Sequence, residues 1–280
     1  MATQPDPVAQ FPVSVETDLG PVTIEAQPSR IVSLSATATE MLYAVGAGPQ
    51  VVATDLTSNF PDEALTTAKL DSFSFNAEEV AALNPDLVIL AFDFQGEGEA
   101  LAALSIPFLM LGPPGDLEGA LSQLLNVGIA TGRGEEAGVM VSDLASEVDE
   151  LVAAAGSIDG VTIYHEVDET LYSATSDSFI GNIYDRLGLV NIADGVEAAG
   201  PFPQLTAEYI VAQDPEFIFL ADANFGVTTE SVADRPGWET VSAVSEGNVV
   251  PLDGDIAGRW GPRTVDLMRS ILTAVETGTP

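Results

Sequence analysis

Side chains able to act as bases or nucleophiles are scarce in this sequence. His165, the one histidine, lies in the run 164–168, Tyr-His-Glu-Val-Asp, and directly follows a predicted buried strand. A Ser-His-Asp arrangement would have to use this histidine. Two other interpretations stay open, a strand-end histidine that hydrogen-bonds locally and a contact to a bound ligand. Cysteine is absent, which excludes a thiolate nucleophile, a disulfide and an iron–sulfur ligand.

The sequence also lacks the residue patterns that are typical of metal-ion and phosphate sites. A single histidine and no cysteine exclude a zinc or manganese site built from several histidines. Asp253 and Asp255 could suggest calcium, but no bidentate acid stands at the spacing that a calcium loop needs. Residues 112–115, Gly-Pro-Pro-Gly, form a turn rather than a phosphate cradle, because two prolines remove amide donors. With no Walker loop, nucleophile elbow or metalloprotease motif, we expect no catalytic residue, no resident metal and no cofactor.

Aromatic side chains are concentrated in the segments that follow predicted strands. In an open α/β sheet such segments face the ligand crevice, and exposed aromatic groups are costly unless they cover something. About half of them could instead pack as small cores beneath the loops. The aromatic residues concerned are Phe60, Phe73, Phe92, Phe94, Tyr172, Phe202, Trp238 and Trp260. This set favours ligand binding over catalysis.

Arginine is placed unevenly, since Arg186, Arg235, Arg259 and Arg263 all fall in the second half of the chain. Arg259 and Trp260 follow the last predicted strand through a glycine-rich loop. A loop arginine beside an aromatic side chain suggests an anionic or π-rich ligand. The alternative, that Arg259 and Arg263 neutralise neighbouring carboxylates, stays open.

The elements that must position these residues alternate between strand and helix. A period-two pattern over 11–25, interrupted at Gly20, predicts a hairpin. The predicted strands are 30–35, 51–53, 87–90, 108–111, 161–164, 217–220 and 249–252. The predicted helices are 36–45, 77–83, 97–104, 134–155, 178–187, 208–212 and 262–275. This order indicates an α/β fold with mostly parallel sheets covered by helices on both faces.

An internal repeat divides the chain. Residues 75–90 align without gaps on 205–220, and each copy reads as a helix, a turn of proline and an acid, and a buried strand. Two ordinary α/β units that converged on one pattern remain an alternative to two homologous lobes.

We expect a tail and hairpin over 1–27, a first lobe over 28–133, a bridging helix over 134–156 and a second lobe over 157–280. The expected ligand site is a cleft between the lobes. A helical linker would permit only small movements of the lobes.

Charge excludes several classes of partner. Forty-three Asp and Glu stand against eight Lys and Arg, for a formal net charge of -35. Such a field repels phosphate backbones and anionic membranes, so no nucleic acid is expected as a partner. The acidity suits a saline or acidic exterior, and a generally acidic proteome explains it equally well.

Targeting segments are not recognisable. No apolar run approaches the roughly 18 residues that span a bilayer. Residues 1–7 lack a basic end followed by an apolar stretch, so we expect no signal peptide in this chain. The chain is then either cytoplasmic or a mature, exported form.

Several motifs resemble one known family. Residues 30–42, RIVSLSATATEML, resemble the opening of ABC-importer substrate-binding proteins for ferric siderophores and cobalamin, as do 84–88, 234–238 and 261–263 in order. The resemblance covers about 28–278 and implies two Rossmann-like α/β lobes joined by one long helix. It also implies a binding protein rather than an enzyme, a monomer, a periplasmic or cell-surface location and delivery to a permease dimer. Family members often carry a lipid-modified cysteine, which is not present here, so a lipid anchor would be absent or removed.

The resemblance assigns two acids to permease docking. In the cobalamin-binding members, one glutamate on each lobe pairs with permease arginines. Glu78 and Glu208 stand at the matching positions and are also identical partners in the internal repeat. The alternative is that they are helix N-terminal acids favoured by the helix dipole.

The resemblance also implies ligand contacts in the loops that follow the strands. The expected contacts are Phe60, Phe73, Phe92, Phe94, His165, Tyr172, Phe202, Trp238, Asp255, Arg259 and Trp260. Cobalamin binders tend to carry Tyr and Trp where this chain has Phe60 and Phe73. A ferric siderophore is therefore the expected ligand, and cobalamin, another corrinoid or haem is the alternative. Trp238 and Trp260 are expected to report ligand binding by their fluorescence.

Two other classes of function stay open. A hydrolase could use the carboxylates of Glu166 and Asp168, and recovery of an unchanged ligand would exclude it. A cytoplasmic ligand sensor would be excluded by a signal peptide or lipid-attachment cysteine in the full-length gene product.

Overall fold

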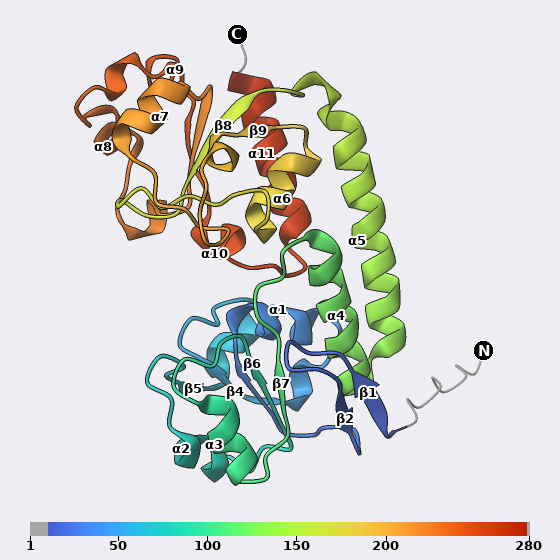
Figure 1. Cartoon of the computed structure of the whole chain (residues 1–280). Helices are drawn as coiled ribbons and strands as arrows, with labels where there is room; N and C mark the ends of the chain where they lie inside the picture. The colour runs from blue at the N-terminus through green and yellow to red at the C-terminus, as the bar shows by residue number, and fades with distance from the viewer. Residues whose placement is uncertain (1–10, 279–280) are drawn as a thin grey trace. The chain divides into compact units, whose positions relative to one another are not determined.

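The buried strands form two separate parallel sheets, one in each of two units (Figure 1). The computed structural model describes residues 11–278. Unit 1 contains 11–113 and 118–144, and unit 2 contains 114–117 and 145–278. The expected tail over the first ten residues lies outside the described part of the chain.

In unit 1 the sheet has five parallel strands in the order β5-β4-β3-β6-β7. Their bounds are β3 (Ile31–Leu34), β4 (Val51–Asp55), β5 (Ala68–Leu70), β6 (Leu87–Leu90) and β7 (Phe108–Met110). The helices are α1 (Ala36–Ala44), α2 (Ala77–Ala82), α3 (Glu97–Ala103) and α4 (Leu117–Thr131). Val32 and Val88 pack on one face against Val80 of α2 and Leu101 of α3. Residues of the opposite face, such as Ile89, are buried as well, so both faces of the sheet are covered.

The predicted hairpin is present as β1 (Val13–Val15) and β2 (Val22–Ile24), which pair antiparallel. Gly20 closes its turn with φ 100°, a conformation that favours glycine. Asp18 fastens the turn to the sheet, since its amide donates to the carbonyl of Met110 at 3.0 Å and its carboxylate accepts from the amide of Gly112 at 2.7 Å.

In unit 2 the sheet has four parallel strands in the order β11-β10-β8-β9. Their bounds are β8 (Thr162–Glu166), β9 (Val190–Asn191), β10 (Phe217–Leu220) and β11 (Val249–Pro251). The helices are α6 (Phe179–Arg186), α7 (Ala207–Gln213), α8 (Thr229–Ala233), α9 (Ser242–Ser245), α10 (Gly254–Ala257) and α11 (Thr264–Gly278). Tyr164, Ile218 and Leu220 pack on one face against Ile210 and Trp238.

Short 3-10 turns complete the described chain. They are η1 (Gly48–Gln50), η2 (Asp62–Thr66), η3 (Ala155–Ser157), η4 (Ile192–Gly195), η5 (Ala223–Phe225) and η6 (Trp238–Thr240).

The long helix α5 (Gly134–Ala154) begins where the sequence predicted, and the division between the units falls within it. It lies beside α4 in unit 1 (Figure 1). A Cβ on Gly128 of α4 would stand 2.2 Å from the Cβ of Ala137, so only glycine permits this approach of the two helices. The α/β class, the parallel sheets and the long helix are therefore confirmed. The cleft between the lobes stays a prediction.

The internal repeat is visible in the backbone of both units. The strands β6 and β10 occupy the same residues of the repeat, 130 positions apart. Asn84 and Asp214, also 130 positions apart, both have φ 48°, the left-handed conformation that ends the preceding helix. Each copy therefore turns from helix to strand in the same way.

The acid of each repeat fixes the start of the neighbouring strand. The Asp86 carboxylate accepts from the amide and the hydroxyl of Ser29 at 2.8 and 2.9 Å, just before β3. The Glu216 carboxylate accepts from the amide and the hydroxyl of Thr162 at 2.8 and 3.0 Å, at the start of β8. The shared turn of proline and acid thus sets the register of the central strand pair in both units.

Candidate functional site

Four phenylalanines of unit 1 lie on the loops at the carboxyl ends of its strands. Phe60 follows β4, Phe73 follows β5, and Phe92 and Phe94 follow β6. All four are exposed, Phe73 and Phe94 by 70% and 72%. The strands are parallel, so these loops leave the sheet at one edge. An apolar surface of this kind is typical of a binding site.

The loop after β6 is held in place by polar contacts. The rings of Phe92 and Phe94 stack with their centroids 4.9 Å apart. The side-chain amide of Gln95 donates to the carbonyl of Phe73 at 2.8 Å, which ties this loop to the one after β5. The amide of Gln95 donates to the buried carboxylate of Glu97 at 2.7 Å. These contacts keep the exposed rings ordered before any ligand binds, which lowers the entropy cost of binding.

The loop after β4, which carries Phe60, rests on a polar network. Buried Asp55 accepts from the amide of Ser58 at 3.0 Å and from its hydroxyl. Lys69 donates to the hydroxyl of Thr54 at 2.8 Å and to the carbonyl of Ser58 at 2.6 Å. Burial lowers the pKa of Lys69. The single lysine of the chain therefore supports this loop.

In unit 2, Tyr172 and Phe202 lie on adjacent segments. Tyr172 forms an antiparallel bridge with Gln204, and the amide of Val167 donates to the carbonyl of Tyr172 at 2.8 Å. Both aromatic side chains are exposed. Phe225 in η5, directly after β10, is 89% exposed and was not predicted. Its place after a buried strand is the pattern that identified the other aromatic residues and would have found it.

Two predicted tryptophan contacts require correction. Trp238 is 1% exposed and packs edge-on against Tyr164 in the core of unit 2, so it is a core residue and not a ligand contact. Trp260 is buried too. A bound ligand is therefore not expected to change their fluorescence by direct contact.

Arg259 pairs with a neighbouring acid. Its side chain is 8% exposed, and its Nη2 lies 2.7 Å from Oδ1 of Asp255, one turn earlier. This contact matches the alternative in which the arginine neutralises a nearby carboxylate. The ion pair weakens the argument for an anionic ligand at Arg259.

His165 lies inside unit 2 and not at a surface. Its ring is 2% exposed, and Nδ1 is 2.9 Å from the hydroxyl of Tyr184, which is also fully buried. The predicted ligand contact is therefore wrong, and the local hydrogen bond of a strand-end histidine is what the structure contains. Burial lowers the pKa of His165 to about 4, so the imidazole is neutral at physiological pH.

The buried histidine predicts an acid-dependent loss of stability. Its folded-state pKa lies below the unfolded value, so the unfolded chain binds the proton first as the pH falls from 6.5 towards 4. The contribution of His165 to the free energy of unfolding is complete above pH 6.5. It falls by about 2 kcal/mol between pH 7 and 4.5.

The test compares wild type with His165→Asn, which keeps a hydrogen-bonding group for Tyr184. Asp222 contributes with the opposite sign, because its raised pKa favours the folded state at low pH. The difference in unfolding free energy between the two proteins, from urea titrations at pH 7 and 4.5, isolates the histidine. If the difference in unfolding free energy between the two proteins is the same at pH 7 and at pH 4.5, the prediction is contradicted.

A buried ion pair closes the end of β8. Glu166 is fully buried, and its two carboxylate oxygens accept from Nη1 and Nη2 of Arg235, each at 2.6 Å. The guanidinium lies over the ring of Trp238, 4.6 Å from its centroid. Asp168 accepts from the amide of Thr170 at 2.8 Å. Glu166, which the hydrolase alternative required, is thus bound on both oxygens.

Beside this ion pair, Asp222 and Tyr164 are also buried. Desolvation, followed by repulsion from Glu166, raises the pKa of Asp222 to about 6. Burial, followed by the charge of Glu166, raises the pKa of the Tyr164 hydroxyl. These groups are therefore poorly solvated.

The two acids of the internal repeat are exposed in both units. Glu78 is the second residue of α2 and Glu208 the second residue of α7. The helices are capped by the side chains of Asn76 and Thr206. Both acids are accessible to a partner, and their predicted role in docking a permease stays a prediction.

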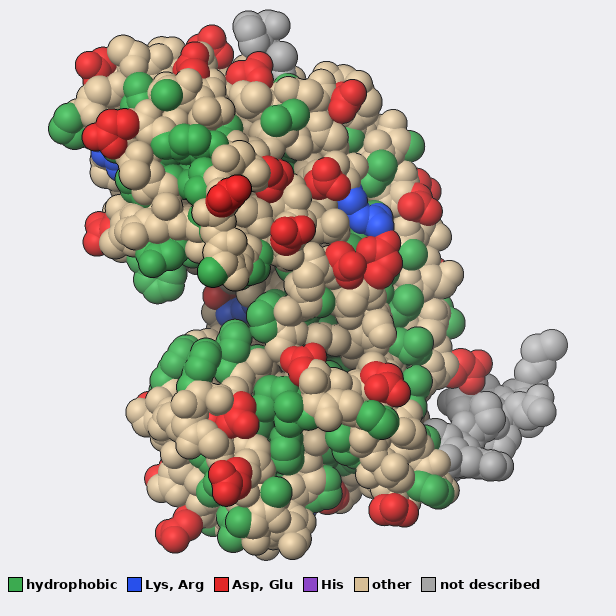
Figure 2. Space-filling view, in the orientation of Figure 1, with side chains coloured by type: hydrophobic (Ala, Val, Ile, Leu, Met, Phe, Trp, Pro, Cys, Tyr) green, Lys and Arg blue, Asp and Glu red, His purple; other side chains and the backbone are tan. Residues whose placement is uncertain are grey.

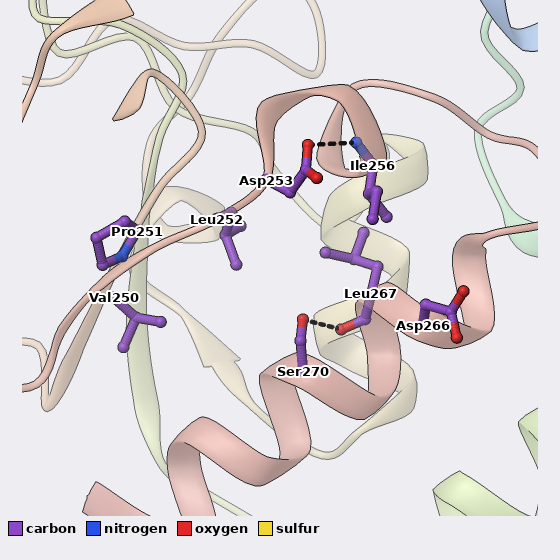
Figure 3. Close-up of a pocket in the computed structure, with 8 residues that line it drawn as sticks. All are labelled: Val250, Pro251, Leu252, Asp253, Ile256, Asp266, Leu267 and Ser270. Atoms are coloured by element: carbon purple, nitrogen blue, oxygen red, sulfur yellow. Dashed lines mark hydrogen bonds between the residues drawn. The ribbon is translucent and has the colours of Figure 1, made fainter. Parts of the chain in front are cut away.

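A small cavity of about 150 Å³ lies in unit 2 beside β11, α10 and α11 (Figure 3). It is lined by Val250, Pro251, Leu252, Asp253, Ile256, Asp266, Leu267 and Ser270. The Asp253 carboxylate caps α10 through the amide of Asp255. The cavity is below the roughly 300 Å³ of ordinary ligand pockets and contains none of the predicted contacts.

The charged groups of the surface are mostly acids. Asp and Glu side chains are scattered over the visible face, with few basic ones among them (Figure 2). Within residues 11–278, no group of three or more His, Cys, Asp or Glu could hold a metal ion. No helix in that range is long and apolar enough to cross a membrane.

Known proteins resemble this chain over most of its length. Residues 31–256 match the family described as Periplasmic binding protein. The ABC transporter substrate-binding lipoprotein YvrC of Bacillus subtilis (strain 168), itself uncharacterized, is 26% identical, covering 96% of this chain and 87% of that protein. A cobalamin-binding protein of Halobacterium salinarum is 24% identical over 98% of this chain and 77% of that protein.

A solved structure of an ABC-type Fe3+-hydroxamate transport system from Saccharomonospora viridis has a TM-score of 0.79 and 19% identity to this chain. The match covers 95% of this chain and 99% of that one. The similarity spans both units, so both share the fold of these proteins.

Proposed function

This chain belongs to the periplasmic binding protein family, and we propose that it captures a bulky metal chelate of low net charge and delivers it to an ABC importer. It is a substrate-binding protein of the ABC-importer type, a class that transports and does not transform its ligand. The proposed location is extracytoplasmic, as in the rest of the family.

The exposed aromatic side chains carry this proposal. Phe60, Phe73, Phe92 and Phe94 gather on the carboxyl-end loops of unit 1, and further exposed rings lie on loops of unit 2. Such surface suits a large ligand with apolar or aromatic faces. The proposed contacts are these four phenylalanines with Tyr172, Phe202 and Phe225.

The net charge of the protein favours some chelates over others. A net charge of -35 repels an anionic ligand, and Arg259 already pairs with Asp255. A ferric trihydroxamate is neutral, because three hydroxamate anions balance Fe³⁺. We therefore favour a neutral ferric siderophore. Cobalamin is the second candidate, supported by the Halobacterium relative that is named for binding it.

Isothermal titration calorimetry with four probes tests the proposal. The probes are ferrichrome, ferric enterobactin, cyanocobalamin and haem. Ferrichrome, which is neutral, is expected to bind at least about tenfold more tightly than the anionic ferric enterobactin. Mass spectrometry of the extracted ligand is expected to find it unchanged. Binding of cyanocobalamin alone selects the second candidate, a chemically altered ligand indicates an enzyme, and binding of none of the four contradicts the proposal.

Replacing Phe92 and Phe94 together by alanine is expected to weaken the binding of the preferred probe about 100-fold, because two apolar contacts are lost. Thermal stability should change little, since both rings are exposed. The matched control is Leu19→Ala with Leu104→Ala, which removes exposed apolar side chains elsewhere in unit 1. Equal affinities for the two double variants would show that the loop after β6 is not part of the binding site.

A further inference from the structure

Three polar side chains of unit 2 come from the adjacent strands β8 and β10 and from the turn that follows β10. Tyr164 and Glu166 are two residues apart on β8, so they point to the same side. Their register partners on β10 are Ile218 and Leu220. Asp222 lies two residues beyond Leu220, and the amide of the intervening Ala221 donates to the carbonyl of Glu166 at 2.9 Å. Asp222 is thus next to the end of β8.

The polar atoms of this group are buried and incompletely bonded. Tyr164 is fully buried and Asp222 is 2% exposed. Among residues 11–278, the Tyr164 hydroxyl and both carboxylate oxygens of Asp222 have no hydrogen-bond partner. Buried polar groups in folded proteins are almost always satisfied by protein, water or an ion. The three unsatisfied oxygens of this group therefore indicate an additional occupant.

Charge balance identifies the kind of occupant. The Arg235 guanidinium neutralises Glu166 through two hydrogen bonds, which leaves the charge of Asp222 without a counterion in this group. A singly charged cation would balance it, whereas a divalent one would leave an excess. Oxygen ligands suit hard cations.

We propose that Asp222 and Tyr164 bind an alkali-metal cation, Na⁺ or K⁺, beside the Glu166–Arg235 ion pair. The side chain of Arg235 is 19% exposed, which gives the ion a route from solvent. The net charge of -35 raises the local concentration of cations at the surface. The ion would fix the start of η5 against the end of β8.

Thermal unfolding in different chlorides tests this site. Wild type is compared in NaCl, KCl and N-methyl-D-glucamine chloride at equal ionic strength, because the organic cation is too large for a buried site. The unfolding midpoint is expected to be about 3 °C higher with Na⁺ or K⁺ than with the organic cation. In Asp222→Asn this difference should disappear.

Asp149→Asn on α5 is the matched control, since it removes the same charge from an exposed position and should keep the full difference. Tyr164→Phe provides a second variant that removes only the hydroxyl, and it should reduce the difference. Persistence of the full difference in Asp222→Asn, or no difference in wild type, would overturn the proposal and leave water or a proton as the occupant.

Discussion

Replacing Arg235 by methionine is expected to destabilise unit 2 by about 3–5 kcal/mol. The substitution leaves the Glu166 carboxylate fully buried without its partner. A buried charge that loses its counterion keeps the desolvation cost without the attraction that offset it. The cation–π contact with Trp238 is lost as well. Urea unfolding followed by tryptophan fluorescence measures the effect, since both tryptophans, Trp238 and Trp260, lie in unit 2.

Arg269→Met is the matched control. Arg269 also pairs with two acids, Glu147 at 3.2 Å and Asp266 at 2.9 Å, but all three side chains are about half exposed. Exposed ion pairs contribute about 0–1 kcal/mol, so this variant should lose little stability. Replacing both Glu166 and Arg235 by apolar residues should restore much of the loss, because no unpaired charge remains. Equal stabilities for the two single variants would show that Glu166 is not held as a buried charge.

Uptake is expected to fall at least about tenfold when Glu78 and Glu208 are both replaced by alanine, while ligand affinity stays unchanged. We propose that the two acids engage corresponding cationic sites on a two-fold symmetric permease. They are exposed and occupy the same position in the two copies of the repeat. Charge-assisted contacts of this kind are strong and geometrically specific.

The measurement uses cells that lack their own copy of the gene and express the variant with its importer. It follows uptake of whichever chelate binds in calorimetry. Glu79→Ala with Glu230→Ala is the control, because these acids lie in the first turns of α2 and α8 and are also exposed. Two results would contradict the docking role. One is weakened chelate binding in the Glu78 and Glu208 double variant, and the other is uptake equal to that of the control.

The sequence predicted the parts of the fold that depend on local pattern. The strands over 87–90 and 217–220 are unbroken apolar runs, as expected where a parallel sheet is covered on both faces. The repeat also predicted the shared turn of proline and acid in which Asp86 and Glu216 lie. The strand over 68–70 and the helices α8, α9 and α10 were missed, because segments of three to five residues show no period. α4 was also missed, although its buried residues Leu117, Ala120, Leu124 and Val127 follow the helical period.

The candidate site was harder to predict, because burial is decided by contacts between distant segments. Trp238 and the exposed Phe94 both looked like loop aromatics, but Trp238 packs on Tyr164, which is far away in sequence. His165 meets Tyr184 across the core. The pairing of Glu166 with Arg235, 69 residues apart, left no trace in local composition.

The basic side chains have a collective consequence for the solvent shell. Lys69 is bonded within its loop, and Arg235 and Arg259 are largely withdrawn from solvent. The outer layer is therefore even richer in carboxylates than the ratio of 43 to 8 suggests. Carboxylates bind hydrated ions tightly, so such a layer resists salting out in brine. In dilute buffer the surface carboxylates repel one another more strongly, and this repulsion lowers the stability of the fold.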